Sequence, residues 1–372
     1  MKNVRNIVLI GVAVLCLMGC GKEVYIENQR FMIAEGIDLD EDNKFVIYTA
    51  SPVFSKEATN KYKITTATAD TLRIGKKKLE SRISGSFGPG KLQSILIGKK
   101  LLQQIDVLPY LDVFFRDPKN EINANMIVVD GSVKDVMYAN TSDKGELGSV
   151  LKLMVESAYK SRISVLTTLQ KYHQQKLDTA ITPSITEMKV DKGELVITGT
   201  TLLHKDGTYA TSLNNQESSL LLLLQHNTKN PIPLTFHLPS EMFHTDEEMS
   251  YVSFNINKVN VNMKHKFEGS HLTVDVLMKV QIDLMERMFD LDMEQQSRQL
   301  ERAIAEELTK ECQDLIKKAG KYQVYPFGLG IYIRSHDYKN WKKIEDNWGQ
   351  VISDAIINMS TQVNIKNIGV SK

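Results

Sequence analysis

The sequence predicts a multidomain α+β protein in which mixed and antiparallel sheets are packed against helices. In the first half, strand-like and helix-like segments alternate along the chain. In the second half, long strands with apolar residues at every second position precede one long amphipathic helix. The chain has 372 residues, a length typical of about two or three domains.

The N-terminal segment has the layout of a secretory signal. Lys2 and Arg5 precede a run of apolar residues at 7–18, which ends at Gly19 and Cys20. This run is shorter than the roughly 20 residues that an α-helix needs to cross a bilayer. We therefore expect a signal peptide that is removed after Gly19, rather than a permanent membrane span.

The sequence Leu17-Met18-Gly19-Cys20 resembles the lipobox of bacterial lipoproteins. This resemblance implies cleavage after Gly19, a diacylglycerol on the thiol of Cys20 and an N-acyl lipid on the same residue. The alternative is a cysteine that merely belongs to the apolar part of the signal. Two acyl chains hold a soluble domain stably at a membrane, whereas one holds it only marginally. No cofactor is expected beyond this covalent lipid.

Cysteine content and charge limit the remaining possibilities. Without the signal peptide, Cys312 is the only thiol besides Cys20, so no internal disulfide is expected. The full chain has a formal charge of +1, and loss of Lys2 and Arg5 makes it −1. This near neutrality gives no indication of nucleic-acid binding.

Residues 31–53 predict two strands around the turn-rich segment 38–43. Three aspartates alternate in this segment, but the calcium loop of an EF-hand is incomplete. Asn43 stands where that loop needs glycine, and Thr49 stands where it needs a bidentate glutamate. A solvated hairpin turn is the better interpretation.

Residues 85–92 (GSFGPGKL) contain the G-x-x-x-x-G-K spacing of a phosphate-binding loop. Leu92 replaces the Ser or Thr that would hold magnesium, and a polar helix-like segment rather than a buried strand precedes the loop. We expect a glycine-rich turn that leads into a strand at 92–97.

The remaining elements of the first half are a helix, a strand and one or two further helices, at 98–105, 123–130 and 146–177. The segment 178–186 contains a proline and small polar residues, which predicts a linker. The predicted domains are accordingly 20–180 and 187–372, the second consisting of one unit or of two.

Strands are expected at 194–204 and 218–226, the latter containing five consecutive leucines. Alternation of apolar residues from Val252 shifts by one position near Lys258, which predicts a β-bulge or a bend there. A turn at 265–270 is expected to lead into a long strand at 272–282.

A helix is predicted at 293–319, ending at Gly320, with Cys312 on its apolar stripe. This position predicts a buried, inert thiol. The acidic residues Glu286, Asp290 and Asp292 precede the helix, where negative charge favours its N-terminus.

No catalytic or metal site is predicted. The sequence contains neither H-E-x-x-H nor G-x-S-x-G. His265 and His271 flank a predicted turn and could meet across it, but two histidines without a third ligand are more typical of a surface than of a zinc site. An envelope hydrolase would need a nucleophile or metal group that the sequence does not indicate.

Several segments, in order along most of the chain, resemble the Ger(x)C family of spore germination lipoproteins. They are the lipobox at Cys20, Gly36-Ile37-Asp38, Ile95-Leu96-Ile97-Gly98, Leu111-Asp112-Val113-Phe114-Phe115-Arg116-Asp117-Pro118, Ile122-Asn123-Ala124, Asp130-Gly131, Phe327-Gly328-Leu329-Gly330, Trp341, Trp348 and the end from Val363 to Gly369. The family is the C subunit of germinant receptors.

This resemblance implies a non-enzymatic lipoprotein on the outer face of the inner spore membrane, acting with multispanning A and B subunits when nutrients trigger germination. Arg116, Asp117 and Pro118 are interpreted as a structural turn fixed by an Arg-Asp pair, or as a partner contact. The alternative function is a solute-binding lipoprotein of a transporter, which usually has two α/β lobes around a ligand cleft.

Overall fold

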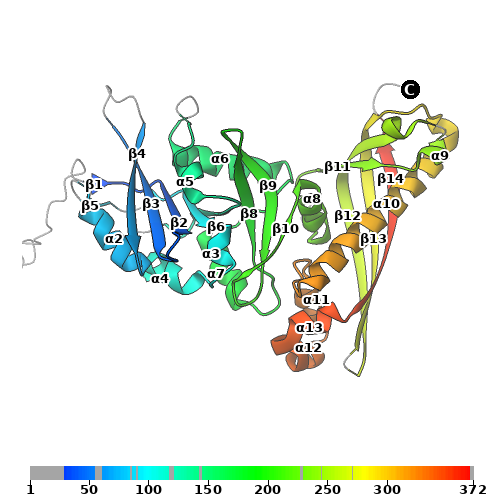
Figure 1. Ribbon diagram of the computed structural model, residues 1–372. Coiled ribbons are helices and arrows are strands. Elements are labelled where there is room, and N and C mark those ends of the chain that lie inside the picture. Colours follow the sequence, from blue (N-terminus) through cyan, green and yellow to red (C-terminus); the bar gives the residue numbers. More distant parts are fainter. Residues whose placement is uncertain are drawn as a thin grey trace, which may run out of the picture.

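The computed structural model describes residues 29–54, 61–83, 86–88, 91–116, 121–141, 145–226, 229–243, 245–269 and 271–368. An eight-stranded sheet forms the N-terminal part, and a four-stranded sheet crossed by a long helix forms the C-terminal part (Figure 1). Helix α8 (Asn215–Leu224) lies between the two sheets in this view. The α+β class is confirmed, with packed helices and mixed sheets that contain antiparallel pairs.

The eight-stranded sheet has the order β10-β9-β8-β7-β6-β2-β3-β4. Its strands are β2 (Ala34–Leu39), β3 (Phe45–Pro52), β4 (Tyr62–Ala69), β6 (Ser94–Gly98), β7 (Asn125–Val129), β8 (Ser184–Asp191), β9 (Glu194–Leu203) and β10 (Tyr209–Leu213). The central pairs from β2 to β8 are parallel, and the outer pairs are antiparallel. Strands β6 and β7 are buried along their whole length, as expected for parallel strands covered on both faces.

Helices cover both faces of this sheet. One face packs against α2 (Leu72–Glu80), α3 (Lys99–Leu102), α4 (Leu108–Arg116) and α7 (Leu169–Leu177), and the other against α5 (Val133–Met137) and α6 (Leu147–Lys160). The predicted helical region at 146–177 thus forms two helices, α6 and α7. A short parallel pair, β1 (Gln29–Arg30) with β5 (Ser86–Phe87), lies beside α2 (Figure 1).

The C-terminal sheet has the order β11-β12-β13-β14. Its strands are β11 (Ile232–His237), β12 (Tyr251–Glu268), β13 (His271–Arg287) and β14 (Ile356–Asn367). Its helices and helical turns are α9 (Ser240–Phe243), η2 (Glu247–Met249), α10 (Met293–Lys321), α11 (Leu329–His336), α12 (Tyr338–Ile344), η3 (Glu345–Asn347) and α13 (Trp348–Ser353).

Strands β12 and β13 are longer than the predicted segments. The register shifts between Ile256 and Lys258, which confirms the predicted bulge. The turn is narrower than expected, because pairing continues to Glu268 and Gly269 turns the chain with a φ of 64°. Strand β14 joins β13 in parallel, so this sheet is mixed rather than purely antiparallel.

The predicted strand at 218–226 is wrong, because this segment forms helix α8. Asn214 and Glu217 form a reciprocal capping box that starts the helix, and all five leucines at 220–224 are buried. A helix surrounded by core has no polar face, so its sequence lacks the periodicity that separates helix from strand.

The predicted linker at 178–186 does not separate the two sheets. Strand β8 begins at Ser184 and pairs in parallel with β7, so the first sheet continues through β10. Ala180, Pro183 and Ser184 are buried, which explains why small residues and proline gather there. The sheet boundary lies instead between Leu213, which ends β10, and α8.

Candidate functional site

The predicted site residues lie mostly beyond the described ranges. Gly19, Cys20, Asp117 and Pro118 are outside them, so the predicted lipid attachment and proline turn stay predictions. Arg116 is described: it ends α4, and its Nε donates a hydrogen bond to the carboxylate of Asp112 one helical turn earlier. Arg116 therefore pairs with Asp112 on its own helix.

The two sheets meet in a junction that the sequence did not indicate. Strand β8 contributes Glu187, a buried residue that is 3 % exposed. Thr201 donates a hydrogen bond to its Oε2 at 2.6 Å, Thr198 donates to Oε1 at 3.3 Å, and the Ser212 hydroxyl also donates to Oε2. Hydrogen bonds from neighbouring strands thus offset the cost of burying this carboxylate.

Lys99, at the start of α3, supplies positive charge beside Glu187. Its Nζ lies 3.6 Å from Glu187 Oε2, 3.2 Å from Asp130 Oδ1 and 5.0 Å from the centre of the Tyr209 ring. Burial lowers the pKa of Lys99, but attraction to Glu187, Tyr209 and Asp130 outweighs this effect and the pKa is raised. Lys99 therefore remains protonated at neutral pH.

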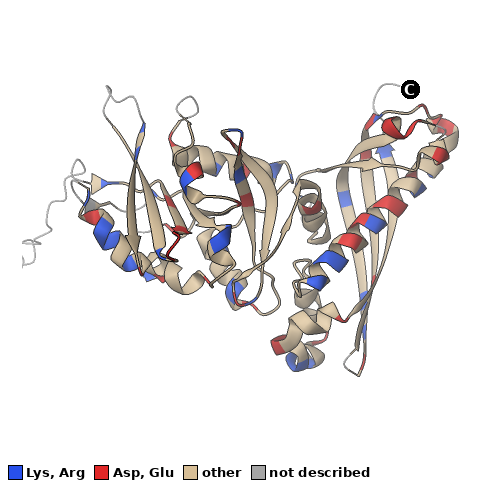
Figure 2. Cartoon of the chain, in the orientation of Figure 1, with Lys and Arg blue, Asp and Glu red and all other residues tan. Residues whose placement is uncertain are grey.

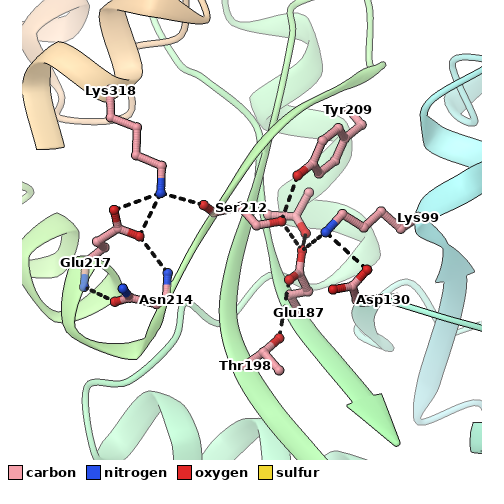
Figure 3. A network of polar contacts seen from close by, with 10 residues as sticks. Lys99, Asp130, Glu187, Thr198, Tyr209, Ser212, Asn214, Glu217 and Lys318 are labelled. Atoms are coloured by element: carbon pink, nitrogen blue, oxygen red, sulfur yellow. Dashed lines mark hydrogen bonds and ion pairs between the residues drawn. The ribbon is translucent and has the colours of Figure 1, made fainter.

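Lys318 connects this cluster to the C-terminal part (Figure 3). From α10, its Nζ donates to the backbone oxygen of Ser212 at 2.9 Å and to both carboxylate oxygens of Glu217 at 2.7 and 2.8 Å. Glu217 also accepts the backbone N–H of Asn214 at 2.8 Å within the capping box of α8. Ser212 links the two groups, since its hydroxyl contacts Glu187 and its carbonyl accepts from Lys318.

A second set of contacts joins the end of α7 to α11. Arg334 donates to both oxygens of Asp178, over 2.6 and 3.0 Å. The bond from Arg334 lowers the pKa of the Asp178 carboxyl, despite an opposing effect of burial. The backbone N–H of Tyr325 donates to Thr182 Oγ1 at 2.8 Å in the same region. Both halves are therefore tied together at more than one point.

An apolar cavity of about 470 Å³ lies beside these contacts. Its lining comes from both parts of the chain and includes Ala180, Leu224, Met263, Tyr325, Phe327 and Tyr332. His226 also lines it, and burial lowers the pKa of this imidazole. The lining contains no Asp, Glu, Lys or Arg, so the cavity offers no charged partner to a bound molecule.

The described residues do not form a metal centre. Within the described ranges, no group of three or more His, Cys, Asp or Glu side chains is placed to hold a metal ion. Cys312 is fully buried and burial raises the pKa of its thiol, so it is a poor nucleophile. His265 does not pair with His271; its Nε2 lies 3.5 Å from Asp337, because β12 continues past the predicted turn.

No helix among the described residues combines the length and apolar character that crossing a bilayer requires. Asp292 caps α10, accepting hydrogen bonds from the backbone N–H groups of Glu294 and Gln295, as the acidic sequence before the helix predicted.

The sequence did contain one signal for the junction, which the sequence analysis did not use. Glu187 follows the buried Ile185 by two positions on β8, so the two side chains lie on the same face of the strand. A carboxylate at such a buried position needs buried hydrogen-bond partners.

Two family profiles match the chain in order. A profile described as "Spore germination protein N-terminal domain" matches residues 22–190. One described as "Spore germination B3/ GerAC like, C-terminal" matches residues 198–369. The chain belongs to this family of spore germination proteins. A role in spore germination follows from this membership, and the resemblance predicted from the sequence is confirmed.

Similar proteins of this family cover most of the chain. The chain is 22% identical over 358 residues to the spore germination protein GerQC of Bacillus cereus, covering 96% of each chain. It is 17% identical to the putative spore germination protein YfkR of Bacillus subtilis (strain 168), covering 99% of this chain and 98% of that one. The crystal structure of the GerBC protein shares its fold, with a TM-score of 0.58, 16% identity and coverage of 90% of this chain and 97% of that chain.

Proposed function

We propose that the chain is a lipid-anchored, non-enzymatic subunit of a nutrient germinant receptor. It acts on the outer face of the inner spore membrane together with multispanning A and B subunits. One observation carries this proposal: the lipobox ends at Cys20, and the family match begins at residue 22 and continues to residue 369. The proposed lipid anchor thus directly precedes the part of the chain that the two germination-family profiles match.

The junction supports an assembly role. Lys318 binds the backbone oxygen of Ser212 and Arg334 binds the carboxylate of Asp178, so side chains of the C-terminal part hold the N-terminal part at two points. The apolar cavity does not favour a solute-binding lipoprotein for charged nutrients, because no charged side chain lines it. The C-terminal part, a mixed sheet with a long helix, also differs from an α/β lobe.

The test replaces Cys20 by Ala, with Cys16→Ala as the matched control in the same leader. Cys20→Ala is expected to release the protein from spore membranes, to remove the lipid mass from the mature N-terminal peptide and to impair nutrient-triggered germination. A trigger that bypasses nutrients should remain effective. Cys16→Ala should behave as the unmodified chain.

Two results would overturn the proposal. One is an unmodified thiol at Cys20 in mass spectra of protein from spore membranes. The other is normal nutrient germination by spores that contain the released Cys20→Ala protein. Co-purification of the A and B subunits with the chain from detergent-solubilised membranes tests the partner assignment separately.

A further inference from the structure

Helix α2 exposes a basic face that the proposed function does not yet use. Arg73, Ile74, Lys77 and Lys78 are exposed, and Ile74 is 46% exposed although it is apolar. The opposite side of the helix packs on the sheet through Leu72, Gly75 and Leu79. Figure 2 shows Lys and Arg gathered along α2. We call Arg73, Ile74, Lys77 and Lys78 the basic face.

Part of the basic face borders an open groove of about 940 Å³ between α2 and α4. Its charged lining residues are Arg73, Lys76, Lys77, Glu80, Asp112 and Arg116. Asp112 is already paired with Arg116. Neither the Arg73 nor the Lys77 side chain has a hydrogen bond or ion pair to another described residue. Their positive charge therefore faces solvent.

The described chain begins next to this helix. Strand β5 follows α2 closely in the sequence and pairs with β1, placing Gln29 opposite Ser86 (Figure 1). Gln29 lies nine positions after Cys20, and an extended chain of nine residues spans about 30 Å. A lipid on Cys20 would thus hold the membrane surface within about 30 Å of the end of the chain beside α2.

We propose that the basic face of α2 binds the anionic headgroups of the membrane to which Cys20 is anchored. The orientation argument rests on the proposed lipid anchor, whereas headgroup binding itself does not. Basic side chains near an anionic surface strengthen binding by about fivefold each, and the exposed Ile74 adds apolar contact with the interface. The acyl chains on Cys20 and the basic face would then bind the membrane together and fix the orientation of the folded protein relative to its surface.

The experiment uses the mature chain with Cys20→Ser, made without the leader, so that no lipid is present. Sedimentation compares its binding to vesicles of phosphatidylglycerol with phosphatidylcholine and to vesicles of phosphatidylcholine alone. We expect binding to the anionic vesicles only, and weaker binding with added salt. Combined Arg73→Gln, Lys77→Gln and Lys78→Gln substitutions should lower it about a hundredfold.

The matched control removes the same charge elsewhere through Lys266→Gln, Lys310→Gln and Lys317→Gln, at side chains with 73%, 64% and 75% exposure. It should bind like the parent protein. Lys78 also donates to the backbone oxygen of Thr68 at 2.8 Å. A second variant with only Arg73→Gln and Lys77→Gln avoids that contact and should bind about 25-fold more weakly.

Equal binding losses in the control and the α2 variants would overturn the proposal, as would equal binding to neutral and anionic vesicles. Unchanged vesicle binding by the α2 variants would also overturn it. If the same substitutions then abolished co-purification of membrane partners, the basic face would bind an acidic protein surface instead. Because this protein lacks the lipid, such failures would leave the Cys20 anchoring result intact.

Discussion

Lys318 on α10 donates hydrogen bonds to both carboxylate oxygens of Glu217 on α8, over 2.7 and 2.8 Å. The same ammonium group donates to the backbone oxygen of Ser212 at the end of β10. One side chain therefore joins the helix on the four-stranded sheet to the last strand of the eight-stranded sheet. It is one of several contacts between the two parts, beside those of Arg334 with Asp178 and of Tyr325 with Thr182.

Lys318→Met should lower the free energy of unfolding by about 1–2 kcal/mol, because Glu217 and the Ser212 carbonyl lose a charged donor at a partly exposed site. Denaturant unfolding measures the change. The control is Lys317→Met, since the neighbouring side chain is 75% exposed and should change stability little. Equal stability of the two variants would contradict the assigned role of Lys318.

Glu187→Ala should be more costly, about 3–5 kcal/mol, because it leaves Lys99 without its buried carboxylate and removes the acceptor of three hydroxyl groups. Unfolding in urea provides the measurement. Glu194→Ala, on the exposed start of β9, is the matched control. A loss below about 1 kcal/mol for Glu187→Ala would mean that the buried network contributes little net stability.

Glu35 on β2 predicts a pH dependence of stability. Burial raises the pKa of this carboxyl from 4.5 to about 7, and the charge of Lys76 opposes the shift only in part. Between these values the unfolded chain has lost the proton that the folded chain retains, so stability falls as pH rises. The shift corresponds to about 3 kcal/mol.

Glu35→Gln should remove this part of the pH dependence and make the chain more stable than the parent above neutral pH. Urea midpoints at about pH 5 and about pH 8 give the comparison. Glu41→Gln, in the exposed turn after β2, should retain the slope of the parent protein. The prediction would be contradicted if the parent protein became more stable between these two pH values and Glu35→Gln removed that increase.

Cys312 should react with thiol reagents only after unfolding. Its side chain is fully buried on α10, and burial raises the pKa of the thiol, so little thiolate forms and none is accessible. The measurement uses the mature Cys20→Ser chain, in which Cys312 is the remaining thiol. Lys317→Cys in the same protein should react at once, since that position is exposed. Immediate modification of Cys312 under native conditions would contradict this prediction.

The sequence predicted those elements in which one face meets core and the other meets solvent. Alternation along 252–282 located two strands and the bulge at Lys258, and the stripe containing Cys312 located α10. The same rule failed for α8, whose leucines are buried all around. It also could not predict that β14 would pair in parallel with β13, since pairing partners are not encoded in local periodicity.

The sequence by itself determined the lipobox at Cys20, the resemblance to the germination family and the buried position of Cys312, because each depends on local order or local periodicity. Only the tertiary structure decided that Ser212 contacts both Glu187 and Lys318, and that Arg334 reaches Asp178. These residues are far apart along the chain. Their contacts arise from the order in which strands pair and helices pack, which no single segment specifies.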